Sequence, residues 1–409
     1  MIKAKPYKLF NKIQNYDWGT KNENAFIPNL IGMKPEVNLP YAELWIGAHP
    51  KASSEIIINQ NRILLNEVID KYPIEILGAE TAEKFSNKLP FLLKVLSASR
   101  ALSIQTHPDK EQAKRLHETD PINYPDNNHK PEIAVALDNL TAIAGFRPAK
   151  EIIENLQNNP EFEIITGSKI FKKLIIETDE SKREKLIKKF YSAVMKKADD
   201  FKTMDTVIKK IAERISAKIE LKQEEEQFLI QYENFGADVG LLSFFFFNII
   251  NLQPGQAIFT DAGVPHAYIE GNIIECMANS DNVVRAGLTN KFKDVDTLLD
   301  VLKYKFNEYK IINEEQKKDN VTLKTSAEEF QITLFEKSKD FTDRFSTNNK
   351  PVIILILEGS LVIESSQNED LSSDTFIKGE SFLIPALIKE YKLSCETDSK
   401  FVTVEIPVN

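Results

Sequence analysis

Residues 351–364 read PVIILILEGSLVIE, two apolar runs separated by the pair Glu358–Gly359. Leucine and β-branched side chains fill Val352–Leu357, a length and composition typical of a buried strand. The Glu–Gly pair is a turn signal, so the second run is expected to fold back on the first. Further strands of this kind are predicted at Phe330–Glu336, Ser381–Ile384 and Phe401–Glu405. Many short antiparallel strands at even spacing favour a jelly roll or a double-layered β barrel.

The same pattern extends toward the N-terminus with one interruption. Pro6–Thr106 reads as short strands separated by turns, and strands resume after Gly236. Between them, Ala149–Phe235 is dense in Lys, Glu, Ile and Leu at helical spacing, so we expect a helical insertion. A chain of 409 residues is too long for one ordinary compact domain. The predicted units are a central β domain (1–148 and 238–315), the helical insertion (149–237) and a C-terminal β domain (316–409).

Composition limits the partners and the compartment. The formal net charge is −9 without a block of consecutive basic residues, which argues against nucleic acid or an anionic membrane as partner. With only Cys276 and Cys395, the chain fits a reducing cytoplasm better than a secreted disulfide scaffold. The N-terminal MIKAKPYKLF lacks the apolar stretch of a signal peptide. The longest apolar run, Val239–Ile250, contains Ser243 and Asn248 and is too short to span a bilayer, so we expect a buried strand.

Four polar residues from three separate segments have the chemistry of a metal site. Gln105 and His107 alternate in a predicted strand, so both side chains point to one face. Glu132 begins the next strand after a loop, and His266 enters a strand much further along the chain. Two imidazoles, one carboxylate and one amide oxygen suit zinc with a position left for water or substrate. Manganese, cobalt or iron would accept the same ligands, and a half-buried histidine bonded to a carbonyl is the ordinary alternative for His107.

Charged residues inside apolar strands are a second signal. Lys94 interrupts an apolar strand, where an unpaired ammonium is costly, so it either snorkels at an edge or pairs with an anion or a metal site. Glu275 lies between Ile274 and Cys276 and either supports a site or faces solvent. Arg285 follows a polar turn and would bind a phosphate or a developing oxyanion through its fork of donors; an ion pair with a nearby aspartate is the alternative.

Long ordered motifs resemble those of the type I mannose-6-phosphate isomerases. They are YAELWIGAHP (41–50), LPFLLKVLSASRALSIQTHPD (89–109), NHKPEIAVAL (128–137), PHAY (265–268) and IECMANSDNVVRAGLTNKFKD (274–294). The resemblance covers nearly the whole chain and implies cupin-type jelly-roll β barrels with an inserted α-helical domain, hence a mainly β fold. It also implies one Zn2+ per chain, bound by Gln105, His107, Glu132 and His266. The family usually has Thr-Pro-Lys where this chain has Thr289–Lys291, which affects loop shape rather than the ligands.

The resemblance further implies interconversion of mannose 6-phosphate and fructose 6-phosphate through an enediol. Arg285, Lys130 and His129 are the expected catalytic residues, and either of the last two would serve as base or ring-opening group. The expected substrate or phosphate contacts are Lys94, Ser103, Trp18, Glu275, Asp281 and Lys291. The expected protein is a cytoplasmic monomer or weak homodimer that supplies carbohydrate metabolism and GDP-mannose biosynthesis. Two rival functions are an iron-dependent cupin oxygenase and a non-catalytic sugar-binding cupin.

Overall fold

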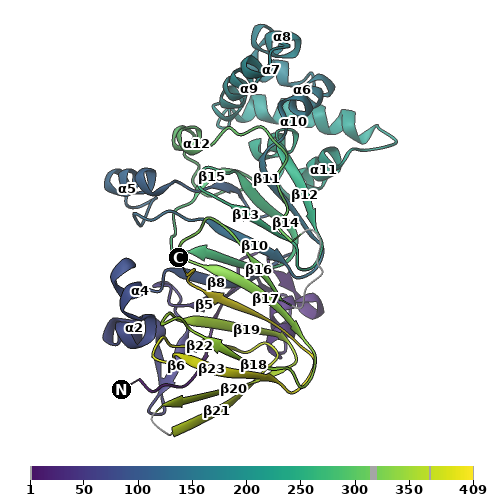
Figure 1. Cartoon of the computed structure of the whole chain (residues 1–409). Coiled ribbons are helices and arrows are strands. Elements are labelled where there is room, and N and C mark those ends of the chain that lie inside the picture. The colour runs from purple at the N-terminus through teal and green to yellow at the C-terminus, as the bar shows by residue number, and fades with distance from the viewer. Residues whose placement is uncertain (1, 314–319, 368–369, 409) are drawn as a thin grey trace.

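The structure is a computed structural model that describes residues 2–313, 320–367 and 370–408, and three antiparallel sheets dominate it (Figure 1). The central sheet has ten strands. Its main path is β12 (Phe247–Leu252), β11 (Leu140–Phe146), β14 (His266–Ala278), β8 (Phe91–Ala98), β5 (Glu43–Gly47) and β2 (Lys12–Gln14). Four strands join beside this path: β9 (Ile104–Thr106), β10 (Glu132–Ala136), β13 (Ala257–Thr260) and β15 (Val284–Gly287).

The other two large sheets come mostly from the C-terminal part of the chain. The six-stranded sheet runs β1 (Tyr7–Leu9), β22 (Ser381–Ile384), β19 (Val352–Glu358), β24 (Ser399–Glu405), β17 (Gln331–Lys337) and β16 (Asn320–Leu323). The four-stranded sheet runs β18 (Thr342–Ser346), β23 (Glu390–Cys395), β20 (Ser360–Gln367) and β21 (Asp370–Ile377). Two short hairpins complete the β structure: β3 (Thr20–Lys21) with β4 (Pro40–Tyr41), and β6 (Glu55–Ile58) with β7 (Asn61–Leu64).

The six-stranded sheet is buried on both faces, which explains the unbroken apolar run of β19. Ile353 and Leu355 pack into the core shared with the central sheet. Ile354 and Ile356 point the other way, into the core shared with the four-stranded sheet. Because alternate residues of a strand face opposite sides, a strand with two buried faces needs apolar residues at every position. The predicted strand at Val352–Leu357 is therefore confirmed, and it lies in the middle layer of the three sheets.

The first strand belongs to the sheet built by the last quarter of the chain. β1 pairs with β22, and Tyr7 lies opposite Leu383. The predicted boundary between residues 315 and 316 lies outside the described residues. The threefold domain division therefore stays a prediction, with β1 crossing from its N-terminal unit into the C-terminal sheet.

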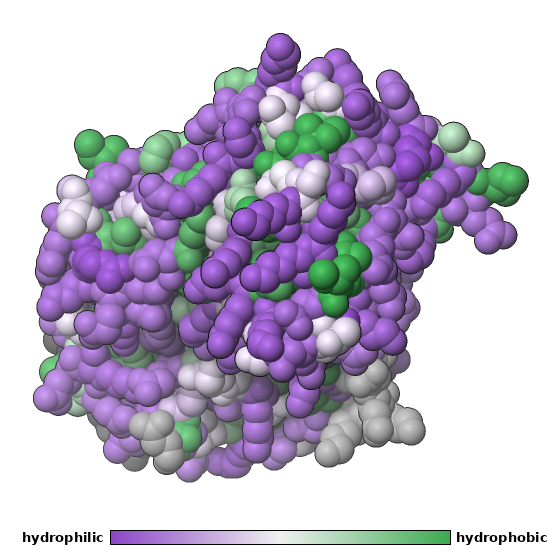
Figure 2. Space-filling view, turned by 90° about the horizontal axis from the view of Figure 1, so that it is seen from above, coloured by the Kyte–Doolittle hydropathy of each residue, from purple (hydrophilic) through white to green (hydrophobic). Residues whose placement is uncertain are grey.

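Helices fill the segment that was expected to be helical. They are α6 (Ala149–Asn158), α7 (Phe162–Thr166), α8 (Ser168–Ile176), α9 (Glu180–Met195), α10 (Phe201–Ser216) and α11 (Gln223–Phe235). Their apolar faces join a core that includes β11 residue Ile143 and the phenylalanines before β12. Figure 2 shows that the face seen from above is largely hydrophilic, with apolar side chains in small separate groups. The lysine pairs Lys188–Lys189 and Lys196–Lys197 are exposed, as expected for a solvated helix face, whereas Glu224 and Glu225 are buried.

Two segments differ from expectation. The buried strand predicted for Val239–Ile250 is wrong in its first half, because Val239–Phe245 forms a 3-10 helix (η2) and only β12 is extended. Asp238 caps this helix, accepting a hydrogen bond from the backbone N–H of Gly240 at 2.7 Å. The sequence of Ala267–Glu270 and Ile273–Ala278 predicts two strands separated by Gly271–Asn272, but the structure has one continuous strand there, β14.

Strands make up about 33% of the chain and helices about 30%. A mainly β fold was predicted, and the observed excess of strand over helix is small. The remaining helices flank the sheets: η1 (Asn22–Asn24), α1 (Phe26–Ile31), α2 (Leu65–Lys71), α3 (Pro73–Leu77), α4 (Ala79–Lys84), α5 (Lys110–Thr119) and α12 (Val295–Val301). Across the described ranges, the helices are too short or too polar to cross a bilayer.

Replacing Asp109 by alanine is expected to lower the free energy of unfolding by about 0.5–2 kcal/mol. Asp109 begins α5 with a capping box: its carboxylate accepts from the backbone N–H of Gln112, whose side chain accepts from the backbone N–H of Asp109. Urea denaturation of the zinc-free protein measures the loss. Glu118→Ala, an exposed change in the same helix, is the control. An equal loss in both variants would contradict the capping role.

Candidate metal centre and active site

Three of the predicted metal ligands meet at one point. Glu132 begins β10, His266 begins β14, and His107 follows the last residue of β9. One ligand atom from each lies within 4.8 Å of the other two, and each residue is only 1% exposed. The strands that carry them neighbour one another in the central sheet, because β14 pairs with both β9 and β10. The sheet therefore assembles a site from segments about 25 to 160 residues apart in sequence, as antiparallel pairing allows.

The hydrogen bonds of the two histidines fix their tautomers. His107 Nδ1 lies 2.7 Å from the carbonyl of Asn282, and His266 Nδ1 lies 3.0 Å from the carbonyl of Val264. A carbonyl only accepts, so each Nδ1–H donates and each Nε2 carries a lone pair. Both lone pairs face Glu132 Oε2, at 3.3 Å from His107 and 3.0 Å from His266.

This arrangement fits a metal ion. With both rings neutral, the two imidazole lone pairs and the carboxylate oxygen are all acceptors, so a cation, either a metal ion or a proton, has to lie between them. His107 Nε2 is buried without a hydrogen-bond partner in the described part of the chain, which a bound cation would correct. Burial lowers the pKa of His107 to about 4 and keeps the ring in the neutral form that binds metals.

The register of β9 places Gln105 and Arg285 beside this cluster. Gln105 lies directly opposite His266 on β14 and directly opposite Arg285 on β15. Residues directly opposite in antiparallel strands project to the same face of a sheet. Gln105 and Arg285 thus share a face with His266. The assignment of Gln105 as a metal ligand stays a prediction.

Arg285 does not form the ion pair that was its alternative explanation. Across the described residues, no carboxylate lies within 4.0 Å of its guanidinium, and Nε is buried without a hydrogen-bond partner. Asp281, an aspartate near Arg285 in the sequence, has a carboxylate oxygen 3.0 Å from Lys51 Nζ instead. Burial lowers the pKa of Arg285, although it stays charged at any physiological pH. An unpaired half-buried guanidinium is a donor available to an anionic ligand.

Lys130 contacts the cluster directly. Its ammonium lies 3.0 Å from Glu132 Oε1, and the residue is buried. Burial would raise the pKa of Glu132, but the charge of Lys130 and the neighbouring His107 hold it well below its ordinary value. Glu132 is therefore ionised. His129, the residue before Lys130, has its Nε2 2.7 Å from Glu329 Oε1.

Lys94 lies between two buried carboxylates. Its ammonium is 3.0 Å from Glu275 Oε2 and 3.5 Å from Glu43 Oε2, and it sits 5.1 Å from the centre of the Trp45 ring. Lys94 is 6% exposed, so edge snorkelling is wrong, and Glu275 does not face solvent. Burial opposes the charge of Lys94, yet Glu275 and Glu43 raise its pKa above the ordinary value. Glu275 lies opposite Ala134, two residues from Glu132, so this charged row shares the face of the cluster.

The other residues predicted to contact the substrate differ in how far they are exposed to solvent. Ser103 is half-buried before β9, and Lys291 is exposed. Lys291 Nζ lies 5.7 Å from the Tyr16 ring centre, and that ring stacks on Trp18 at 5.9 Å. Trp18 packs on a small core that contains Ala134 and Tyr268. The structure thus brings Lys291 and Trp18 together through Tyr16, which the sequence analysis did not single out.

Three further residues of the site were missed. Glu43 interrupts an apolar strand as Lys94 does, a signal that could have found it. The Tyr268 hydroxyl is buried without a hydrogen-bond partner among the described residues, on the strand that carries His266. Asn282 acts through its backbone carbonyl, a role that side-chain chemistry cannot predict.

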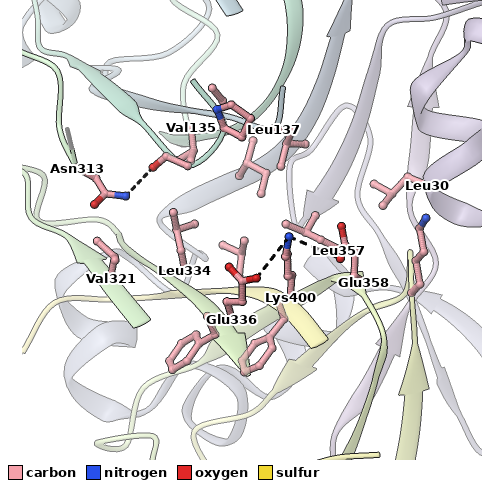
Figure 3. Close-up of a pocket in the computed structure, with 18 of the residues that line it drawn as sticks. Leu30, Val135, Leu137, Asn313, Val321, Leu334, Glu336, Leu357, Glu358 and Lys400 are labelled. Atoms are coloured by element: carbon pink, nitrogen blue, oxygen red, sulfur yellow. Dashed lines mark hydrogen bonds and ion pairs between the residues drawn. The ribbon is translucent and has the colours of Figure 1, made fainter. Parts of the chain in front are cut away.

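A cavity of about 510 Å³ lies elsewhere, between the central and six-stranded sheets (Figure 3). Its walls are apolar side chains, including Leu30, Val135 and Leu334. Three of its charged groups pair with one another: Lys400 Nζ lies 3.6 Å from Glu336 and 3.8 Å from Glu358. Because no residue of the metal cluster lines it, this cavity is not a competing candidate for the active site.

Comparison with known proteins agrees with this geometry. The model of the type I phosphomannose isomerase catalytic domain matches residues 7–149. Mannose-6-phosphate isomerase from Ogataea parapolymorpha is 36% identical over 398 residues, covering 91% of this chain and 92% of that protein. An arginine-to-alanine mutant of phosphomannose isomerase from Salmonella typhimurium superposes with a TM-score of 0.85 at 28% identity, covering 99% of this chain and all of that one. A mannose 6-phosphate isomerase bound with zinc and yttrium superposes with a TM-score of 0.84 at 27% identity, with the same coverage.

The fold and the site thus define an enzyme built on antiparallel β sheets. Its candidate metal centre lies beside the cationic side chains of Lys130 and Arg285. The chain belongs to the type I phosphomannose isomerase family, whose curated members are mannose-6-phosphate isomerases.

Proposed function

We propose that the chain interconverts mannose 6-phosphate and fructose 6-phosphate, using one Zn2+ held by Gln105, His107, Glu132 and His266. Family membership supports the isomerase activity. The observation that carries the metal is the convergence of two imidazole lone pairs on Glu132 in a buried site. The structurally similar isomerase that binds zinc supports the choice of ion.

The reaction moves a proton between C2 and C1 of the sugar through an enediol, and negative charge develops on the two sugar oxygens. When bound, zinc supplies a Lewis acid that stabilises this charge. Arg285 is placed to donate to an anionic oxygen, since its Nε has no partner among the described residues. Lys130, charged beside Glu132, suits donation of a proton or hydrogen bond to a sugar oxygen.

The proton-transfer base is His129 or Lys130. His129 is part exposed and paired with Glu329, so it can take up a proton that this carboxylate stabilises. Lys130 is the one in contact with the cluster, but as an ammonium it first has to lose a proton. We therefore propose His129 as the base and Lys130 as the ring-opening group.

The phosphate and the sugar need separate contacts. We propose that Ser103 and Lys291 contact the phosphate, since both are accessible to solvent near the site. Lys94 and Glu275 neutralise each other and would orient the buried end of the sugar. Trp18 would close the mouth, and Asp281 would hold the adjoining turn.

The wider setting is part of the same proposal. We place a cupin-type jelly roll in the β sheets, with units at 1–148 and 238–315, 149–237 and 316–409. A cytoplasmic monomer or weak homodimer that serves GDP-mannose biosynthesis, with no nucleic-acid partner, fits the net charge of −9 and the two unpaired cysteines. Analytical ultracentrifugation would measure the oligomeric state.

Removal of the metal is expected to abolish turnover of mannose 6-phosphate, and added Zn2+ is expected to restore it. The experiment couples metal analysis to a turnover assay before and after chelation. Parallel additions of Mn2+, Co2+ and Fe2+ identify the preferred ion. Full turnover by metal-stripped protein would refute the proposal. Oxygen consumption with iron would favour the oxygenase, and sugar binding without turnover would favour a binding protein.

A further inference from the structure

The carbonyl that fixes the His107 tautomer belongs to a tightly tethered turn. Asn282, whose backbone oxygen accepts from His107 Nδ1 at 2.7 Å, is fully buried. Its side-chain amide donates to the carbonyls of Asp126 at 2.7 Å and Asn128 at 2.9 Å, and lies 3.1 Å from Asp126 Oδ1. The position of this carbonyl is therefore set from the loop that precedes β10.

The carboxylate of Asp126 joins the two segments. Oδ1 accepts from the Ser280 hydroxyl at 2.8 Å and from the backbone N–H of Asn128 at 3.0 Å. Oδ2 accepts from the backbone N–H of Asp281 at 2.7 Å. One carboxylate thus binds the turn that holds the His107 acceptor and the segment that leads into Glu132.

The charge of Asp126 is met by hydrogen-bond donors rather than by a cation. No lysine, arginine or histidine of the described residues forms an ion pair with Asp126 within 4.0 Å. The neighbouring Asp281, by contrast, forms an ion pair with Lys51. A carboxylate bonded to several N–H and O–H groups fixes their mutual geometry, which a single ion pair would not do. Such a carboxylate suits the placement of a turn.

We propose that Asp126 is a positioning residue of the metal centre. It acts through Asn282, holding the carbonyl that keeps the His107 proton on Nδ1 and the Nε2 lone pair directed at Glu132 and His266. Without Asp126 the turn gains freedom, and the Nε2–H tautomer, which has no lone pair on Nε2 to bind the metal, becomes populated. This inference rests on the proposed function for its metal.

The test is the affinity for Zn2+ alone, measured by competition with a chelator. Asp126→Ala is expected to weaken the affinity about 10–100-fold, the usual effect of losing a hydrogen bond that orients a metal-bound histidine. Asp120→Ala is the matched control. Asp120 lies in the same loop region and likewise accepts from a backbone and a side-chain amide, both of Asn123, but has no link to the turn. Its affinity is expected to be that of the unaltered protein.

A second readout follows the tautomer itself. Nitrogen-15 NMR of the zinc-free protein is expected to show His107 protonated at Nδ1, and Asp126→Ala is expected to shift part of the population to Nε2. A lost helix or sheet contact would not by itself move this signal. If the unaltered protein bound no zinc, the proposed function would fail, and the tautomer would still decide the role of Asp126.

Asn282→Ala keeps the backbone carbonyl but removes the side-chain hydrogen bonds that hold it to the loop before β10. This variant tests the inference if Asp126→Ala does not fold. It is expected to weaken zinc binding in the same way, and the double variant is expected to be little worse than Asp126→Ala alone. Unchanged zinc affinity with an unchanged tautomer in a folded Asp126→Ala or Asn282→Ala protein would overturn the inference.

Discussion

Replacing His107 by alanine is expected to give a folded protein that no longer holds stoichiometric zinc and no longer turns over mannose 6-phosphate. His107 supplies one of the two imidazole lone pairs that face Glu132, and its ring is completely enclosed. The loss of affinity should exceed the roughly 10–100-fold that removal of an outer hydrogen bond causes. Metal analysis after gel filtration, followed by a turnover assay, measures both effects.

His117→Ala is the matched control for this experiment. His117 lies ten residues further on, in α5, and its Nδ1–H donates to the carbonyl of Tyr124 at 2.8 Å. This variant is expected to keep its zinc and its turnover. Stoichiometric zinc in His107→Ala would show that the ligand assignment is wrong.

Replacing Arg285 by alanine is expected to leave the zinc content unchanged and to lower kcat by about 10²–10³-fold. The guanidinium lies on the face of the cluster, half-buried and without a carboxylate partner among the described residues, so its donors are free for an oxyanion. Arg285→Lys is expected to recover only part of kcat, because an ammonium keeps the charge and loses the planar fork. Steady-state kinetics with metal analysis on the same samples separates the two quantities.

Arg115→Ala provides the comparison, because Arg115 is an exposed arginine paired with Asp300 on the surface. Its removal is expected to leave kcat unchanged, as exposed pairs contribute little. Full turnover in Arg285→Ala would refute a role for this residue in catalysis. A loss of zinc from Arg285→Ala would instead assign it to the assembly of the metal site.

The sequence predicted the sheets well where one pattern had one physical meaning. The apolar run of β19 reads as a doubly buried strand and is one. The equally apolar Val239–Phe245 is a 3-10 helix, because an apolar run without periodicity does not distinguish a buried helix from a buried strand. Its Asp238 cap was the available helix signal. β18 was overlooked because most of its residues are exposed and polar.

For the site, residue chemistry predicted which side chains meet but not how they are held. His107, Glu132 and His266 were grouped from their types and spacing, and the structure brings them together. The two partners of Lys94 could not be predicted, because Glu43 and Glu275 lie on two different strands. Their register with the strand of Lys94 is known only from the folded structure. The support from Asp126 runs through backbone groups, which every residue possesses, so no residue type marks it.

The pairing of β1 with β22 also orders events during synthesis. Tyr7 leaves the ribosome long before Leu383, and at about 5–20 residues per second β1 waits several tens of seconds for its neighbour. Until then the six-stranded sheet cannot close, and afterwards β1 covers one edge that would otherwise be open to other chains. The central sheet, whose strands all precede residue 288, can form first. The pairing of β1 with β22 therefore comes late in synthesis, and loss of β1 would leave the edge of β22 exposed.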